Sequence, residues 1–256
     1  MTRQPYLYIA EINGSLLKKA SKYCFDESSS QTLSLPAMTL SSQVKFLIRK
    51  EIVLEWRSKY AFNGILLYVI STVFVCFLTF KAIEPITWNA LFWIIMLFAS
   101  VNAITKSFVQ ESSGRQLYYY TLASPQAIIL SKIIYNIMLM MLLSLIALGF
   151  YMVVFKNPVG DPLYYLLAVL LGSISFATVF TMISGIASKA QNSGALMAIL
   201  SFPVIIPLLV VLLKFSKNAM DGLDRSVSFN EIGVLAAINA IVVTVSLLLF
   251  PYLWRD

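Results

Sequence analysis

The sequence predicts an all-α integral membrane protein with six transmembrane helices, an N-terminal cytoplasmic interfacial helix and a short cytoplasmic coupling helix between spans two and three. The first observation behind this fold class is composition: the chain is 59% hydrophobic and only 12% charged, about half of the charge of a soluble domain. The second is the presence of six charge-free windows, each long enough to cross a bilayer. The third is that the charged residues gather between these windows, which favours lipid as the solvent.

The charges that bound each window define the predicted spans. A helix needs about 20 apolar residues to cross a hydrocarbon core of about 30 Å, and the six windows hold 21 to 27 residues. A shorter charge-free stretch between Arg115 and Lys132 is interrupted by Pro125, so we do not expect it to cross. The predicted spans are about 61–80, 86–105, 128–155, 163–187, 193–213 and 232–253.

The distribution of Lys and Arg predicts the orientation, because short cytoplasmic loops carry an excess of both. With the N-terminus inside, the cytoplasmic segments from residue 38 onward hold ten Lys and Arg, and the opposite side holds five. Both termini are therefore predicted to be cytoplasmic. The net charge of +7 follows from this topology and from attraction to anionic lipid or a cytoplasmic partner, and we expect no nucleic-acid binding.

The composition excludes several kinds of functional site. The sequence has no histidine, so Ser-His-Asp catalysis, His-ligated zinc and His-ligated haem are ruled out. Cys24 and Cys76 lie too far apart for a CxxC site. No charged residue lies within the six windows, which argues against a self-powered ion-coupled transporter. No Gly-rich loop ends in Gly-Lys-Ser/Thr, so we expect no enzyme, metal site or directly bound cofactor, and a partner must supply any ATP hydrolysis.

Residues 1–37 differ from the rest of the chain. They mix charged and polar residues and include a Ser-rich run at 28–32. We interpret them as a disordered or mis-called N-terminal extension, with Met38 as the natural initiator of a permease domain over 38–256. A translated, disordered extension remains the alternative.

The segment 44–60 is predicted to form the interfacial helix. One apolar stripe repeats every four residues, at Val44, Ile48, Ile52 and Trp56. Phe46 and Val53 project from the opposite side, and Glu55 and Lys59 are spaced for a helical ion pair. Such a helix suits a place between lipid and protein, and a simple membrane-surface anchor is the other interpretation.

The segment 105–126 is predicted to hold a short helix outside the bilayer. Gly114 breaks the chain before it, and Ser124-Pro125 breaks it again, because the residue before proline is pushed out of the helical region. The helix between these breaks carries three consecutive tyrosines, Tyr118 to Tyr120. They serve either as a headgroup-level aromatic belt or as anchors in a protein interface.

The fifth predicted span contains Pro203 and Pro207 in the run Phe-Pro-Val-Ile-Ile-Pro. Two prolines four residues apart should bend or interrupt that helix near its middle. A kinked packing element and a hinge or gate are the two interpretations.

Two segments carry a family resemblance: GRQLYYYTLASPQAIILSK at 114–132 and NSGALMAILSFPVIIPLLV at 192–210. Together with the six spans, they make the chain over about 40–256 resemble the permease subunit of the cytochrome c maturation ABC transporter, heme exporter protein B (CcmB). The first segment is similar to the Gly-x-Leu-x-x-Leu-x-x-x-Pro pattern of ABC-2-type permeases in general. This chain departs from many relatives at Tyr118 to Tyr120, where Glu and Leu are usual.

The resemblance implies partners and a set of contact residues. In ABC-2-type permeases the short helix docks on an ATP-binding cassette subunit, with the N-terminal helix beside it. Carried over, the ATPase-facing residues are Arg115, Gln116, Leu117, Tyr118, Tyr119, Tyr120 and Leu122, together with Lys50, Glu51, Glu55, Trp56 and Arg57.

The resemblance also implies a biological role. It places the chain in a bacterial-type inner membrane, as a homodimer beside a haem-handling membrane protein and a haem chaperone. ATP hydrolysis would drive haem delivery or release of the haem-loaded chaperone, with haem as the handled species. The alternatives are an ABC-2-type permease for another amphiphile, such as a lipid, glycan or drug, and a non-transport membrane scaffold or enzyme.

Overall fold

The computed structural model describes residues 39–58, 60–80, 83–104, 123–188, 193–223 and 225–253. Within these residues it is helical and contains no strand. The elements are α2 (Leu40–Ser58), α3 (Tyr60–Thr79), α4 (Pro85–Ile104), α7 (Pro125–Val154), α8 (Pro162–Ala187), α9 (Ser193–Met220), the 3₁₀ helix η1 (Arg225–Ser228) and α10 (Phe229–Leu253). The expected N-terminal extension and the expected short helix at 115–122 lie outside the described residues.

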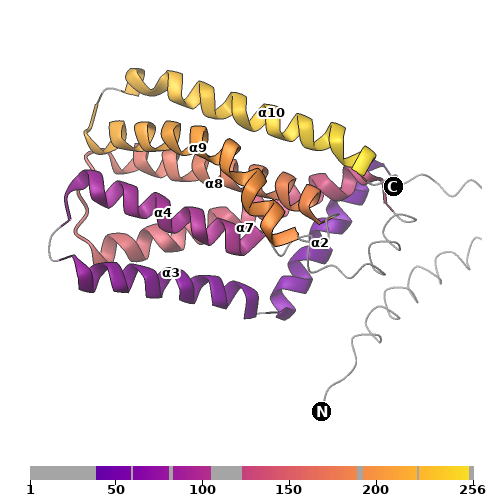
Figure 1. Cartoon of the computed structure of the whole chain (residues 1–256), viewed down its shortest axis with the longest axis horizontal. Helices are drawn as coiled ribbons and strands as arrows, with labels where there is room; N and C mark the ends of the chain where they lie inside the picture. Colours follow the sequence, from indigo (N-terminus) through magenta and orange to yellow (C-terminus); the bar gives the residue numbers. More distant parts are fainter. Residues whose placement is uncertain are drawn as a thin grey trace, which may run out of the picture. The chain divides into compact units, whose positions relative to one another are not determined.

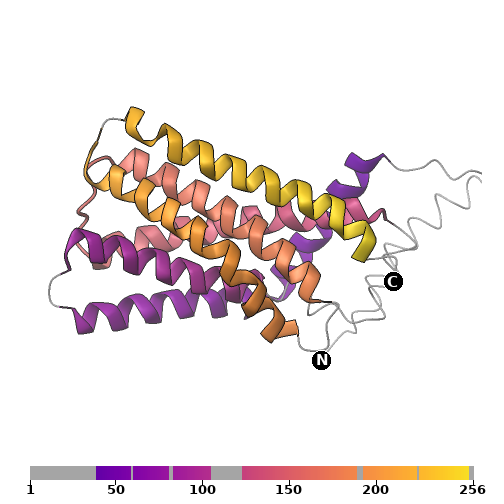
Figure 2. The ribbon, with the colours of Figure 1, turned by 45° about the horizontal axis from the view of Figure 1, so that its top comes forward.

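Six of the described helices are long and apolar enough to cross a membrane: α3, α4, α7, α8, α9 and α10. Each overlaps one of the predicted windows, and α7, α9 and α10 extend past a charge that bounds theirs. Successive helices run in alternating directions, so that α3, α7 and α9 begin at one end of the bundle and α4, α8 and α10 end there (Figures 1 and 2). Helix α2 lies across that same end and packs mainly on α7 (Figure 1).

Three of the helices begin at a proline. Pro85, Pro125 and Pro162 are the first residues of α4, α7 and α8, where the missing N–H has no helical partner to lose. Ser124 caps α7 by accepting a hydrogen bond from the Ala127 N–H. The predicted break at Ser124-Pro125 is therefore confirmed, and α7 begins at Pro125 instead of about residue 128.

Helix α9 is longer than expected. We predicted a span ending near residue 213, because Lys214 follows, but α9 continues to Met220. The reason is an ion pair: Lys214 Nζ lies 2.7 Å from Glu231 Oε1 on α10, while the lysine side chain stays 69% exposed. A long lysine can remain in a helix when its ammonium reaches a carboxylate at the boundary of the apolar region.

Both prolines of the fifth span lie inside α9, which is continuous from Ser193 to Met220. The ribbon bends within the helix in Figure 1, so Pro203 and Pro207 do not interrupt it. Of the two expected outcomes, the bend is therefore found and the interruption is not, since one helix can lose single backbone hydrogen bonds at proline and still continue. The hinge or gate role of the two prolines stays a prediction.

Helix α8 is at the centre of the bundle. Of its apolar 18-residue window, 67% is buried, against 17% of the corresponding windows of α3 and α10. Hydrogen-bonded polar side chains link it to its neighbours, at Ser173–Ser144 (2.8 Å), Thr181–Asn136 (2.8 Å) and Thr178–Asn239 (2.9 Å). Between helices in lipid such contacts help to set the packing geometry. The predicted windows lack charge, but the helices do not lack polar interactions.

Large aromatic side chains fill the end of the bundle opposite α2. Trp88, Trp93 and Tyr165 are each 1% exposed or less. The polar atoms of two of them join helices: Trp93 Nε1 donates to Ser216 Oγ of α9 (2.8 Å) and Tyr165 Oη donates to Asn89 Oδ1 of α4 (3.1 Å). Closely packed, buried aromatic rings give this end a rigid core.

The chain between α7 and α8 is held against the end of α9. The Gly160 N–H donates to the Met220 carbonyl (3.0 Å), and the Asp161 N–H donates to the Ala219 carbonyl (3.1 Å). A Cβ at Gly160 would lie 2.8 Å from the Met220 oxygen, so this approach requires glycine. Arg225 Nη2 adds a further contact by donating a hydrogen bond to Asp161 Oδ2 (3.1 Å).

The contacts of the Asp161 carboxylate make the stability of the protein depend on pH. The hydrogen bond from the Tyr164 N–H, followed by that from Arg225, holds the pKa of Asp161 below its ordinary value. The contribution of Asp161 to stability is therefore fully present above the ordinary carboxyl pKa of about 4 and is lost as the pH falls through the lower, folded-state value.

We expect Asp161→Asn to lower Tm at pH 7 and to flatten the acid limb of Tm against pH. The control is Asp221→Asn, at an exposed aspartate on the same side, and equal acid limbs in wild type and Asp161→Asn would contradict the assignment.

Candidate functional site

The residues predicted to face a partner fall into two groups. The seven from Arg115 to Leu122 lie outside the described part of the chain, so their docking role stays a prediction. The other five, Lys50, Glu51, Glu55, Trp56 and Arg57, all lie on α2. The side chains of the first three are described, and each is half-buried.

The buried face of α2 differs partly from the predicted stripe. Val44 and Leu47 are each 7% exposed, whereas Ile52 is 40% exposed. Val44 and Leu47 form a small core with the first turns of α7 and one residue of α10, comprising Ala127, Ile128, Ile129, Ile133 and Phe250. Burial thus follows the three- and four-residue spacing of a helix on a neighbouring helix, and a strict four-residue repeat drifts out of the contact. Phe46 is exposed, as expected from its position opposite the stripe.

Two polar contacts join α2 to α7. Gln43 Oε1 accepts hydrogen bonds from the backbone N–H and the hydroxyl of Ser124, at 3.1 Å each. Two turns further along, Lys132 Nζ donates to Glu51 Oε1 at 3.3 Å. Both contacts join positions 81 residues apart, so the two helices run in the same general direction through this contact. Ser124 therefore both caps α7 and binds α2.

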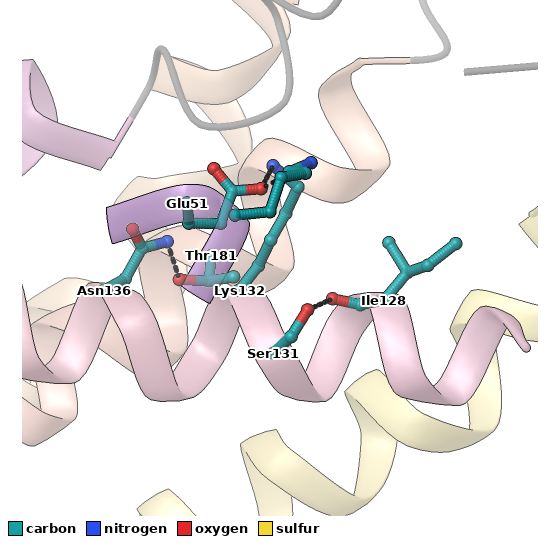
Figure 3. Close-up of polar contacts among 7 residues, drawn as sticks. Glu51, Ile128, Ser131, Lys132, Asn136 and Thr181 are labelled. Atoms are coloured by element: carbon teal, nitrogen blue, oxygen red, sulfur yellow. Dashed lines mark hydrogen bonds and ion pairs between the residues drawn. The ribbon is translucent and has the colours of Figure 1, made fainter. Parts of the chain in front are cut away.

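The ion pair is buried (Figure 3). The Lys132 side chain is 3% exposed and that of Glu51 is 16% exposed, and Figure 3 shows Lys132 extending from α7 to the carboxylate on α2. Lys50 Nζ lies 3.0 Å from the same oxygen. Burial alone would raise the pKa of Glu51, but the charges of Lys132 and Lys50 and the hydrogen bonds from both hold it below its ordinary value. Glu51 is therefore a carboxylate at neutral pH.

Polar contacts continue from this pair into the bundle. Asn136 lies one turn beyond Lys132 on α7 and donates to Thr181 Oγ1 of α8 at 2.8 Å (Figure 3). One turn before Thr181, Thr178 donates to Asn239 of α10 at 2.9 Å. Three successive contacts thus connect α2 with α7, α7 with α8, and α8 with α10.

Sequence reasoning missed the role of Lys132. We counted it as a cytoplasmic charge that bounds the third charge-free window, whereas it lies in the second turn of α7 with its ammonium buried against α2. The signal that could have found it is its place seven residues after the helix-starting Pro125, among Ile and Leu. Glu51 was predicted to face a partner, and the structure places its carboxylate in the contact with α7.

The arrangement is a junction between helices. In the part of the chain that the structure describes, no three His, Cys, Asp or Glu side chains gather to hold a metal ion. What the site does contain is a helix attached to the start of a central span by two polar contacts and a small apolar core. Such a junction can pass movement from one side of the membrane into the bundle.

Comparison with known proteins gives one clear result. A family model described as CcmB protein matches residues 42–252, which run from the first turn of α2 to the last turn of α10 and include all six candidate spans. A comparison with curated proteins gives no match. Because the family match covers well over half of the 256 residues, the chain belongs to the CcmB family, the multi-pass membrane component of the ABC-type haem exporter system of cytochrome c maturation.

Proposed function

We propose that this chain couples ATP hydrolysis by a partner ATP-binding subunit to haem delivery, or to release of a haem-loaded chaperone, on the opposite side of the membrane. The observation that carries the proposal is the family match over residues 42–252. The α2–α7 junction supports it, since this junction follows directly on the segment predicted to dock the ATPase. The sequence has no nucleotide-binding Gly-Lys-Ser/Thr of its own, in keeping with a permease subunit that is not itself an enzyme.

The predicted docking segment is covalently joined to α7. Leu122 precedes the Ser124 cap by two residues, so a displacement of the segment 115–122 acts first on α7. Because α2 is attached to the same turns of α7, it moves with α7. The contacts at Thr181 and Asn239 then carry the displacement to α8 and α10.

The proposal includes an assembly and an orientation. Two copies of a six-span subunit with two ATP-binding subunits make a twelve-span core in a bacterial-type inner membrane, with both termini cytoplasmic. The end of the bundle that holds α2 then faces the cytoplasm. With no histidine in the sequence, we propose a mechanical role for this subunit and not haem ligation.

Affinity purification of the native protein in mild detergent, with mass spectrometry of its partners, tests the proposal. Haem staining of c-type cytochromes in a deletion strain completes the test. We expect an ATP-binding subunit together with haem-handling components, and loss of covalent c-type haem on deletion. An ATP-binding subunit without haem-handling components, and normal c-type cytochromes on deletion, would instead indicate an ABC-2-type permease for another amphiphile.

A further inference from the structure

We propose that Glu51 and Lys132 are positioning residues whose ion pair makes α2 and α7 move as one body during the ATP-driven cycle. The inference rests on the proposed function and names the contact that transmits movement within it. The carrying observation is a charged pair bridging two helices with the lysine side chain only 3% exposed. Lys132 reaches the carboxylate from the second turn of α7, directly behind the predicted docking segment.

Stability alone does not explain this pair. Removing a lysine ammonium and a carboxylate from water costs several kcal/mol per ion, and the pair repays this only with good geometry and further hydrogen bonds. A well-packed apolar pair of similar volume is often as stable or more stable. The surroundings are already apolar, with Val44 and Leu47 against Ile128 and Ile133. A charged pair in such a place fixes the relative position of the two helices, because its hydrogen bond is directional and apolar contacts are not.

The two polar contacts are spaced to prevent sliding. Gln43–Ser124 lies at the beginning of the α2–α7 contact and Glu51–Lys132 eight residues further along both helices, which is about 12 Å at 1.5 Å per residue. One contact alone would act as a pivot. With two, α2 cannot slide along α7 or rotate about it unless a hydrogen bond breaks. The small apolar core between them permits both motions at low cost, because hydrophobic contact is non-directional.

The pair also stands at the first of the three interhelical contacts that lead into the bundle. Asn136 lies one turn beyond Lys132 and holds α8 through Thr181. Loss of the ion pair should therefore leave α7, α8 and α10 associated, while α2 becomes free to move relative to α7. This predicts a defect in coupling without a matching defect in assembly.

The test uses the whole complex and a neutral replacement. Single variants remove one partner of a buried ion pair, which is destabilising, so the informative variant is the double change Glu51→Gln with Lys132→Met. We expect its abundance and its recovery of the ATP-binding subunit to stay within about twofold of wild type. Covalent c-type haem formed per ATP hydrolysed should fall by about tenfold. The exchanged pair, Glu51→Lys with Lys132→Glu, should restore most of this loss.

Lys45→Met is the matched control. Lys45 is exposed on α2, and it is not among the residues predicted to face the ATP-binding subunit. Coupling in this variant should stay close to wild type. A neutral double variant with normal coupling would overturn the proposal, as would loss of folded protein in both double variants, because that pattern indicates a purely structural pair.

A second measurement does not depend on haem delivery. Spin labels at Phe46→Cys on α2 and Met138→Cys on α7, both 52% exposed in the wild type, report the distance between the two helices once Cys24 and Cys76 are replaced by serine. We expect one distance distribution in the ATP-bound and ADP-bound complexes for the paired protein, and different distributions for the neutral double variant. Identical behaviour of the two proteins would refute the positioning role. Failure to recover an ATP-binding subunit with the wild-type protein would instead refute the proposed function.

Discussion

Replacing Tyr118, Tyr119 and Tyr120 together with alanine is expected to release the ATP-binding subunit while the protein remains inserted in the membrane. Aromatic anchors at the centre of an interface commonly carry about 2 kcal/mol or more each. Even with strong non-additivity, the triple change should weaken the complex by about 100-fold or more. Co-purification of the ATP-binding subunit at equal amounts of membrane-inserted protein measures the effect. Covalent c-type haem should fall in parallel.

The control for this experiment removes an aromatic residue elsewhere at the same predicted side of the membrane. Tyr252 is 71% exposed near the end of α10, and Tyr252→Ala should leave the complex intact. If the triple variant also retained the ATP-binding subunit, the three tyrosines would be better explained as a headgroup-level aromatic belt. Lower insertion of the triple variant with normal recovery per inserted molecule would point to the same explanation.

The largest expected effect on stability is at Gly172. A Cβ built on this residue of α8 would lie 2.5 Å from the ring of Trp93 on α4. That ring cannot yield easily, because Trp93 is 1% exposed and its Nε1 is bonded to Ser216 of α9. We expect Gly172→Val to lower the free energy of unfolding by about 1–3 kcal/mol and Tm by about 2–12 °C. Thermal unfolding of the detergent-solubilised protein measures the shift.

A matched substitution separates this clash from a general effect of valine in a spanning helix. A Cβ at Gly149, on α7, meets nothing within 4 Å, so Gly149→Val should be neutral or slightly stabilising. Combining Gly172→Val with Trp93→Leu should cost less than the sum of the two single changes, because the leucine removes the ring that clashes. Strict additivity would show that the two residues are not in the predicted contact.

Much of the fold follows from local sequence, as the spans show. The windows between charges matched six helices, and Ser124-Pro125 marked the start of α7, because proline and a capping serine act within one turn. In lipid each spanning segment must satisfy its own backbone hydrogen bonds, so a helix is the available solution for each apolar window. Such properties depend on residues close together in the chain and can be predicted without knowing the neighbours of a helix.

The positions of charges were harder to predict. Lys214 was expected to end a span and instead lies within α9, because Glu231 of α10 receives its ammonium. Lys132 was counted as a cytoplasmic charge at the edge of the third window, and instead its ammonium is buried, because Glu51 of α2 receives it. In both cases the partner is on another helix, so no local pattern around the lysine reports it. The prediction of the buried face of α2 was wrong for the same reason: Leu47 is buried, whereas Ile52 was expected to be buried.

The sequence by itself determined which segments are spans and where several of them begin. It also determined which family the chain resembles. Only the tertiary structure decided which face of α2 is buried, how far α9 extends, and that Glu51 and Lys132 meet across 81 residues. The physical reason is that apolar burial in lipid is a property of each segment alone, whereas the cost of burying a charge depends on whether an opposite charge lies within hydrogen-bond distance. That condition is met only when helices distant in sequence pack side by side.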